Sequence, residues 1–357
     1  MTVIIYSFLG SLRPTSNFPQ KKFQSTTSGI WRALAGCLVL MAYGVFAPRI
    51  SQAAPPDASY ELALSQFRSG KYREATATLR GALEQYPQNA QFELLLARCY
   101  YEMGDLNRAT EHAESAADID PSSSEAHLWL GQVYGRQAEQ SHSLILASKT
   151  RKEFEKAVEL APHNIEARRD LMEFYLQAPW LLGGSRDKAR KQVDAIAALD
   201  SLEGALARAR FDELVDQPAE AAAEYQQVLA MKPDCLGPYM EAADFYLKQR
   251  NVAGMKEVIS AALKVNAADL RLDYYRGVAH VLQGNHFVEA ERELRAYVNH
   301  GPFRSDFPSP ASALSWLGRL YEQWGRPQLA VAQYQAALQL NPHLGGAREA
   351  LQRLKKP

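Results

Sequence analysis

The chain has 357 residues, 47% of them hydrophobic, and is therefore long enough to bury a large apolar core. Its 40 basic and 40 acidic residues balance, but residues 1–56 hold five basic residues and no acidic one, which leaves 35 basic against 40 acidic residues in the remainder. This acidic remainder argues against a nucleic-acid-binding protein, which would carry a basic face.

The first predicted element is a leader over residues 1–53. Basic residues precede an apolar run over 33–47, and residues 51–53 supply small side chains of the kind found at a signal-peptidase cleavage site. Pro48 ends this run short of the roughly 20 apolar residues that a membrane-spanning helix needs. The pattern predicts a cleaved signal peptide and an exported protein, periplasmic or secreted. An uncleaved anchor in the inner membrane, an organellar transit peptide and lipidation at Cys37 remain open.

After the leader, prolines follow helix-like segments at a recurring spacing. They are Pro87, Pro121, Pro162, Pro233 and Pro342. The first gap is 34 residues. The next gap is one length of 34 residues plus 7, the third is two lengths plus 3, and the fourth is three lengths plus 7. Proline cannot continue a helix, so each one marks the end of a unit. The spacing predicts about eight repeats over residues 54–343.

The repeats keep their frame with two insertions and one weak element. In repeat three the extra residues lie within Arg136–Lys152, and in repeat four a segment over Pro179–Gly184 separates the two helices. The first helix of repeat five, over Ala205–Asp212, is the least regular. A Pro-rich segment over Gly301–Pro310 precedes repeat eight, and its Phe303 and Phe307 are expected either to cover repeat seven or to mark a hinge before repeat eight. Both insertions join the first helix of a repeat to the second, so we expect them to project from the same edge.

Repeat eight shows the pattern most completely, as Trp316-Leu317-Gly318-x-x-Tyr321 followed by Ala330, Tyr334, Ala337 and Pro342. Small residues at these intervals let two antiparallel helices approach closely, and the large ones fill the gaps. The order resembles that of the tetratricopeptide repeat, a 34-residue helix–turn–helix unit. The resemblance implies an all-α, right-handed superhelical solenoid. Residues 344–357 resemble the polar capping helix that ends such arrays.

Two further sets of residues are interpreted within this frame. Five tyrosines share one position in the first helices: Tyr100, Tyr134, Tyr175, Tyr246 and Tyr321. We interpret them as an aromatic column in the core, with a ligand-binding stripe as the alternative. Cys99 and Cys235 fall in predicted helices about four repeats apart, and because solenoid contacts are mostly between neighbours we expect two free, packed thiols.

The sequence predicts binding rather than catalysis. It contains no zinc-protease motif, no phosphate-binding loop and no nucleophile elbow, so we expect no catalytic residues, cofactor or metal. The resemblance implies that the first helices line a concave groove that receives an extended peptide or a helix. On that frame the groove candidates are Arg98, Glu102, Gln132, Arg136, Arg169 and Glu173. The arginines could grip carboxylates of a partner, and a surface in which these charges pair with one another is the alternative.

One subclass of the family clamps the C-terminal carboxylate of cytosolic heat-shock chaperones with Lys and Asn on successive helices. Here the corresponding positions hold Tyr60, Leu64, Leu95, Glu125 and Trp129, so the clamp is missing.

The second contact candidate is the apolar insertion of repeat four, with Trp180, Leu181 and Leu182 between helix-breaking residues. Either it folds back onto the insertion of repeat three, at Leu144–Leu146, or it contacts a partner or a membrane surface.

Together these features favour a non-enzymatic protein–protein interaction scaffold in the cell envelope, with a protein partner of unknown identity and no nucleic acid. A membrane-tethered structural or assembly factor, attached only through a retained leader, and a carrier of a hydrophobic ligand are the alternatives. The oligomeric state is left open.

Overall fold

The computed structural model describes residues 56–301, 304 and 306–354, and these residues form seventeen α-helices and one 3-10 helix without a strand. Sixteen of the helices form eight consecutive antiparallel pairs. The pairs are α2 (Pro56–Arg68) with α3 (Tyr72–Leu83), α4 (Ala90–Glu102) with α5 (Leu106–Ile119), α6 (Ser124–Ser141) with α7 (Leu144–Leu160), α8 (Ile165–Gln177) with α9 (Arg186–Leu199), α10 (Ser201–Leu214) with α11 (Pro218–Ala230), α12 (Gly237–Lys248) with α13 (Val252–Ala262), α14 (Leu270–Gln283) with α15 (Phe287–His300), and α16 (Pro310–Gln323) with α17 (Pro327–Leu340). The predicted all-α solenoid of eight repeats is confirmed.

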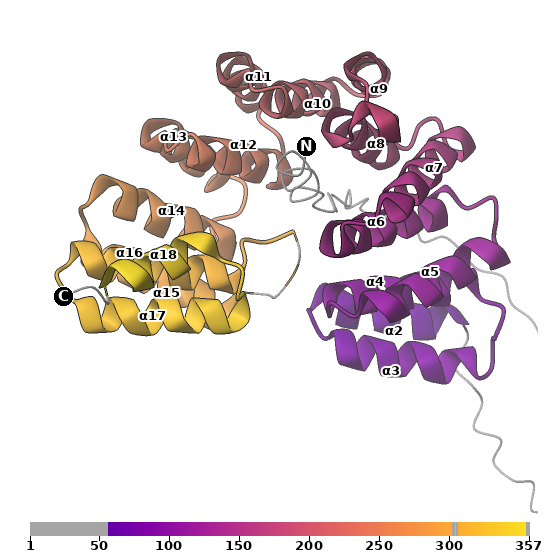
Figure 1. Cartoon of the computed structure of the whole chain (residues 1–357), viewed down its shortest axis with the longest axis horizontal. Coiled ribbons are helices and arrows are strands. Elements are labelled where there is room, and N and C mark those ends of the chain that lie inside the picture. The colour runs from indigo at the N-terminus through magenta and orange to yellow at the C-terminus, as the bar shows by residue number, and fades with distance from the viewer. Residues whose placement is uncertain (1–55, 302–303, 305, 355–357) are drawn as a thin grey trace, which may run out of the picture.

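The pairs follow an arc that curves back, so that the first and last pairs face each other (Figure 1). The first helices, such as α10 and α12, lie toward the enclosed space, and their partners α11 and α13 lie outside. The last helix, α18 (Gly345–Leu354), packs against α16 and α17, where the capping helix was expected.

Helix starts and turns follow from local sequence. The side chain of Asn89 accepts a hydrogen bond from the backbone N–H of Phe92 at 3.1 Å, and Asn164 does the same for Ala167 at 3.0 Å. Such caps satisfy donors that the first helical turn leaves free. Gly104, between α4 and α5, has a φ of 77°, a left-handed conformation that costs glycine little.

Small residues permit the close approach of paired helices. A Cβ atom added at Gly318 would lie 2.6 Å from the ring of Tyr334, and one added at Gly131 would lie 2.6 Å from the ring of Phe154. Each of these two glycines therefore receives an aromatic ring from the second helix of its own pair, as the sequence pattern predicts.

The tyrosine column is confirmed as part of the core. All five rings are buried, and several hydroxyl groups bond to the second helix of the preceding or the same pair. Tyr175 donates to Glu155 at 2.9 Å, Tyr134 donates to Glu114, and Gln226 donates to Tyr246 at 3.0 Å. These polar ends link one repeat to its neighbour.

The core is divided into three successive clusters. One spans α2 to α6, a second spans α6 to α10, and the third spans α10 to α18. This is the arrangement of a solenoid, in which each unit packs mainly on its neighbours.

Three local features differ from expectation. The insertion of repeat three is not a loop: it lengthens α6 to 18 residues and α7 to 17, with only His142 and Ser143 between them. The weak element of repeat five is a regular helix of 14 residues, α10. Cys99 is free and buried as expected, but Cys235 is exposed in the connection between α11 and α12, so the prediction that it is packed in a helix was wrong.

The predicted leader, 1–53, lies outside the described residues. Among the described helices, none combines the length and the apolar composition that crossing a bilayer requires.

Candidate binding surface on the inner helices

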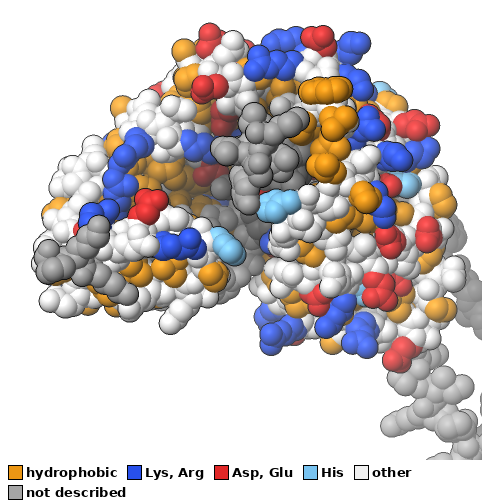
Figure 2. All heavy atoms as spheres, in the orientation of Figure 1, with side chains coloured by type: hydrophobic (Ala, Val, Ile, Leu, Met, Phe, Trp, Pro, Cys, Tyr) orange, Lys and Arg blue, Asp and Glu red, His pale blue; other side chains and the backbone are white. Residues whose placement is uncertain are grey.

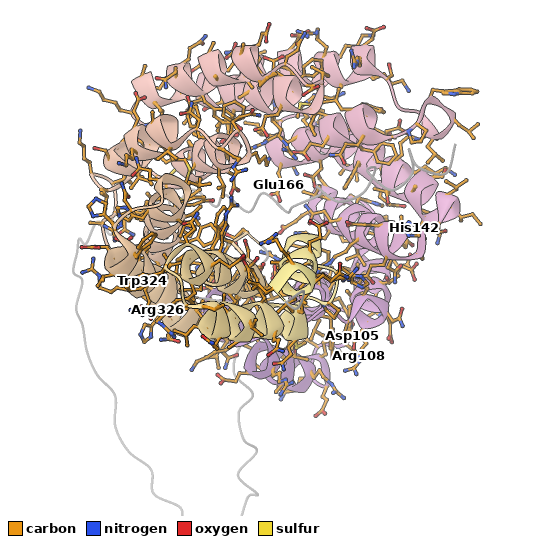
Figure 3. All side chains as sticks on the ribbon, turned by 60° about the vertical axis from the view of Figure 1, so that its left-hand side comes forward. Asp105, Arg108, His142, Glu166, Trp324 and Arg326 are labelled. Carbon is orange, nitrogen blue, oxygen red and sulfur yellow. The ribbon has the colours of Figure 1, made fainter. Side chains whose placement is uncertain are left out.

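The predicted groove residues lie on the first helices of the pairs, α4, α6 and α8. Figure 3 shows Glu166, at the start of α8, facing the space that the arc encloses, whereas His142, Trp324 and Arg326 lie at its margin. The structure thus supplies the inner surface on which the sequence placed the groove.

Arg98 is buried between two aromatic rings. Its guanidinium lies 5.0 Å from the ring centre of Phe67 on α2 and 4.8 Å from that of Trp129 on α6, and its Nη1 lies 3.4 Å from Glu125 Oε1. Arg136 similarly lies 4.5 Å above the ring of Tyr101 and donates to the Tyr101 carbonyl at 3.3 Å. Both arginines therefore connect neighbouring first helices.

Glu102 and Gln132 complete the N-terminal part of this surface. Glu102 is partly buried at the end of α4, where its charge adds to the burial that raises the pKa of Tyr72. Gln132 is buried on α6 and donates to Asp170 on α8 at 2.7 Å. Burial raises the pKa of Asp170 well above its ordinary value.

Glu166 lies beside this pair and is partly buried. Burial raises its pKa to about 7, and the nearby charge of Glu125 acts in the same direction, whereas Arg98 and Gln132 oppose the rise. A carboxyl group that titrates near neutral pH therefore faces the enclosed space (Figure 3).

Arg169 joins three first helices. It is buried on α8, with Nη2 2.6 Å from Glu241 on α12 and Nη1 3.4 Å from Glu203 on α10. Since two carboxylates from different repeats converge on one buried guanidinium, this side chain holds the middle of the arc together.

Glu173 begins a second chain of ion pairs. Arg210 on α10 contacts it through Nε at 2.8 Å and Nη2 at 3.0 Å, and Nη1 of Arg210 lies 3.5 Å from Glu213. Lys248 on α12 also reaches Glu213, at 2.9 Å. The candidate groove residues of repeats two to four are thus engaged by residues of the chain itself, which favours the self-paired alternative for this half of the surface.

A hollow of about 320 Å³ lies farther along the inner helices, in repeats six to eight. Asp244, Leu247 and Lys248 of α12 and Tyr274 of α14 form part of its lining. The rest of the lining comes from the Pro-rich segment and α16: Phe307, Pro308, Ser309, Ser312 and Trp316. We call this hollow the inner cleft. It combines an apolar lining with a carboxylate and an ammonium group, which suits a side chain of a bound peptide.

Phe307, Pro308 and Ser309, in the described part of the Pro-rich segment, form a wall of the inner cleft. The guanidinium groups of Arg271 and Arg304 lie 4.5 Å and 5.2 Å from the ring centre of Phe307, and each pairs with an Asp at 2.9 Å and 2.8 Å. Tyr297 of α15 donates to the Pro308 carbonyl at 2.5 Å. The described part of the segment therefore covers repeat seven, one of the two roles expected of it.

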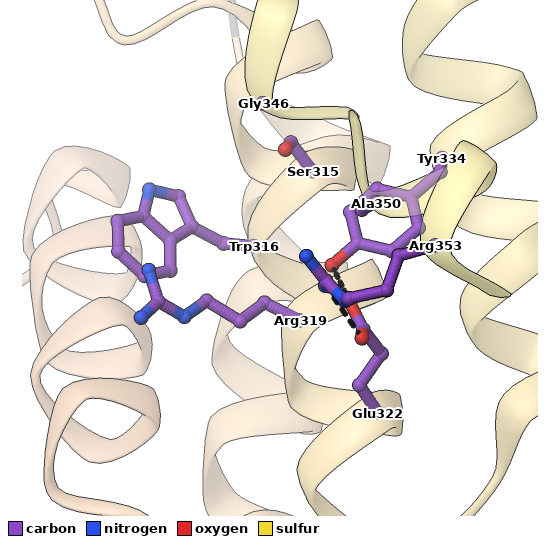
Figure 4. Close-up of a pocket in the computed structure, with 8 residues that line it drawn as sticks. All are labelled: Ser315, Trp316, Arg319, Glu322, Tyr334, Gly346, Ala350 and Arg353. Carbon is purple, nitrogen blue, oxygen red and sulfur yellow. Dashed lines mark hydrogen bonds and ion pairs between the residues drawn. The ribbon is translucent and has the colours of Figure 1, made fainter. Parts of the chain in front are cut away.

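A second hollow of about 320 Å³ lies between α16, α17 and α18 and shares Trp316 with the inner cleft. Figure 4 shows Trp316 stacked with Arg319 on one side, and Glu322 contacted by Tyr334 and Arg353 on the other. The charged groups of both hollows are engaged within the chain: Glu322 pairs with Arg353 here, whereas in the inner cleft Lys248 pairs with Glu213 and Asp244 accepts a hydrogen bond from Tyr275.

Comparison with known proteins bears on this architecture. Residues 66–127 and 311–344 match family models described as the tetratricopeptide repeat. The chain is a tetratricopeptide repeat protein. Proteins of this family generally act as protein–protein interaction scaffolds. A comparison with curated proteins found no match to the sequence.

Similar solved structures include a tetratricopeptide repeat protein of Thermus thermophilus, 23% identical, with a TM-score of 0.46 over 54% of this chain and 100% of that one. A tetratricopeptide repeat protein of Parabacteroides merdae is 12% identical, with a TM-score of 0.45 over 84% and 98%. The Cut9–Hcn1 hetero-tetramer of the APC/C is 15% identical, with a TM-score of 0.49 over 87% and 57%.

The insertion candidates lie apart from the inner surface. Trp180 and Leu181 form part of the 3-10 helix η1 (Trp180–Leu182) and are 84% and 70% exposed, whereas Leu182 packs against the second core cluster. The described residues contain no group of His, Cys, Asp and Glu side chains suited to a metal ion.

Proposed function

We propose that this tetratricopeptide repeat protein is a non-enzymatic scaffold of the cell envelope that holds a peptide or a helix of a partner protein along its inner helices, anchored in the inner cleft. The observation that carries the proposal is the cleft itself. It lies along the first helices α12, α14 and α16, where the partly exposed Leu247, Phe307 and Trp316 offer apolar surface beside Asp244 and Lys248.

The composition of the inner surface indicates which part of a partner binds where. Repeats two to five present charges that are paired internally, and breaking such buried pairs would be costly. An apolar side chain that packs on Leu247, Phe307 and Trp316 leaves the Lys248–Glu213 pair at the edge of the inner cleft in place and excludes water from aromatic rings, which are the usual energetic centres of interfaces. The cleft is therefore the proposed anchor, and the paired surface is the wall along which the remaining peptide runs.

Affinity capture from the protein's own envelope tests this function. Ser312→Trp places an indole in the inner cleft, and Ser260→Trp, at an exposed position on the outer helix α13, is the matched control. We expect a defined partner to copurify with the natural chain and with the Ser260 variant, and to be lost from the Ser312 variant. Retention by both variants would refute the role of the cleft.

The envelope location rests on the sequence pattern of the leader. N-terminal sequencing and fractionation of the natural protein test it directly. A processed species released with the periplasm supports export, and a protein recovered with the cytosol and keeping its first residues would contradict it.

A further inference from the structure

Two neighbouring turns expose large apolar side chains at one edge of the solenoid. In η1, Trp180 and Leu181 are 84% and 70% exposed, and at the start of α7, Leu144 and Ile145 are 51% and 74% exposed. η1 lies against α7, and Figure 2 shows exposed hydrophobic side chains next to Lys and Arg over the region of α7 to α9. We call these four side chains the apolar tip.

The backbone of the repeat-four turn is firmly built. The carbonyl of Pro179 accepts hydrogen bonds from the N–H groups of Leu182 at 2.9 Å and Gly184 at 3.1 Å, and Ser185 donates to the Tyr175 carbonyl at 2.8 Å. Gly183 has a φ of 95°, and a Cβ atom on Gly184 would lie 1.7 Å from the Ala178 carbonyl oxygen. With Leu182 packed inward, this geometry holds Trp180 and Leu181 outward in water.

The surroundings of the apolar tip are strongly basic. Residues 141–152 and 178–193 contain seven Lys and Arg residues and a single acidic residue, Asp187, in a chain whose total charge is zero. The exposed members of the basic set are Lys149, Lys152, Arg186, Lys188, Arg190 and Lys191. Some are also held by rings, since Lys188 Nζ lies 5.2 Å from the ring centre of Tyr175 and Lys149 Nζ lies 4.7 Å from that of Tyr134.

Fewer acidic than basic groups are exposed near the tip. Glu139 of α6 and Glu153 and Glu155 of α7 are partly buried, and the last two are engaged by His127 and Tyr175, whereas Asp187 and Asp194 of α9 are exposed beside six exposed Lys and Arg side chains. An exposed apolar tip within a basic ring is therefore the arrangement that the structure presents to its surroundings.

We propose that the apolar tip and its basic ring bind the surface of a bilayer rich in anionic lipids. Trp prefers the level of the lipid headgroups, Leu and Ile enter the acyl boundary, and Lys and Arg side chains reach phosphate groups from beside them. This contact lies outside the inner cleft and leaves that cleft open to a protein partner.

The shape of the tip favours a membrane over a protein partner. Neither hollow described above is lined by residues of the tip, and an exposed apolar surface flanked by mostly basic side chains complements a flat anionic surface. A protein partner would have to supply both a matching pocket and an acidic rim.

A site-specific probe separates binding by the tip from any binding by the leader. In the full chain with Cys37→Ser, Cys99→Ala and Cys235→Ser, an environment-sensitive nitrobenzoxadiazole dye is attached at Leu181→Cys. The matched control carries the dye at Val288→Cys, which is 65% exposed on α15. Each protein is mixed with vesicles of phosphatidylglycerol and phosphatidylcholine, and with vesicles of phosphatidylcholine alone.

We expect the dye at position 181 to shift to shorter wavelength and to be quenched by a lipid-borne quencher only with the anionic vesicles, while the dye at 288 stays in water. Reversing two charges, with Lys188→Glu and Lys191→Glu, is expected to weaken this binding by at least ~10-fold.

Three results would overturn the proposal: no association with anionic vesicles, association that leaves the dye at 181 in water, or equal insertion of both dyes. A dye at 181 that ignores vesicles but responds to a purified envelope protein would show the tip to be a protein contact instead.

Discussion

Replacing the buried guanidinium of Arg169 tests whether its ion pairs hold the first helices in the middle of the solenoid together. Arg169→Met keeps most of the aliphatic volume but leaves Glu203 and Glu241, which contact the guanidinium at 3.4 Å and 2.6 Å, without their counter-charge. We expect the packing of α8, α10 and α12 against one another to be destabilised.

The expected loss in the free energy of unfolding is about 3–5 kcal/mol at about pH 8, the cost typical of removing one partner of a buried ion pair. Burial already raises the pKa of Glu203, and Arg169 lowers it, so the substitution raises that pKa further. Protonation of the orphaned Glu203 carboxyl then relieves the loss, which we expect to shrink as the pH falls toward about 5.

Urea denaturation at the two pH values measures the effect, and hydrogen exchange of α8, α10 and α12 shows where it acts, since repeat arrays need not unfold in one step. Arg168→Met is the matched control. Arg168 is partly exposed and bonds only the Pro162 carbonyl and Gln192, both at 2.7 Å, so we expect a loss of about 1 kcal/mol. An equal loss for the two variants, or a loss for Arg169→Met that does not depend on pH, would refute the reasoning.

Three further predictions concern packing, the tyrosine column and the inner surface. Gly318→Val should lower the free energy of unfolding by about 1–3 kcal/mol in a urea titration because its Cβ would lie 2.6 Å from the Tyr334 ring, whereas Gly81→Ala, with nothing within 4 Å, should not destabilise. Tyr175→Phe should cost about 1 kcal/mol through loss of the bond to Glu155, and no change in thermal stability would contradict the proposed link between repeats. Burial raises the pKa of Glu166 to about 7, so its contribution to the free energy of unfolding is greatest at acidic pH and is lost as the pH rises through about 7. Glu166→Gln should flatten that part of the plot of stability against pH, and an unchanged plot would contradict the raised pKa of Glu166.

The repeat frame could be predicted from sequence because it depends on contacts within one helix pair. Gly318 and Tyr334, or Gly131 and Phe154, lie within a single repeat, and the order of small and large residues reveals them directly. The hidden length of α6 and α7 shows the limit of this approach. The sequence spacing shows that repeat three has seven added residues, but it does not show whether they form a loop or extend both helices. In the structure they form nearly two helical turns, divided between α6 and α7.

The pairing of the inner surface could not be predicted because its partners are far apart in the chain. Arg169 and Glu241 are separated by 72 residues and meet only when three first helices are stacked. Arg210 could have been found as a partner for Glu173, since both lie two residues before the tyrosine position of their repeats. In repeat five Asp212 occupies that position, so the frame was read as irregular and Arg210 was missed.

The inner cleft was missed for a related reason. Its walls come from α12, α14, α16 and the Pro-rich segment, and no single repeat contains more than part of the lining. The signal present in the sequence was the pair Phe303 and Phe307, expected to cover repeat seven or to mark a hinge. Phe307 does form a wall there, and Phe303 lies outside the described residues.

The central claim, that a partner protein is held at the inner cleft, is tested most directly by photo-crosslinking in the protein's own cells. A benzophenone amino acid replaces Lys248, exposed at the edge of the inner cleft, or Lys256, exposed on the outer helix α13. The account predicts one discrete protein adduct at position 248 that is missing at position 256 and is lost when Ser312→Trp is added. The same adducts from both positions, or none at 248, would contradict it.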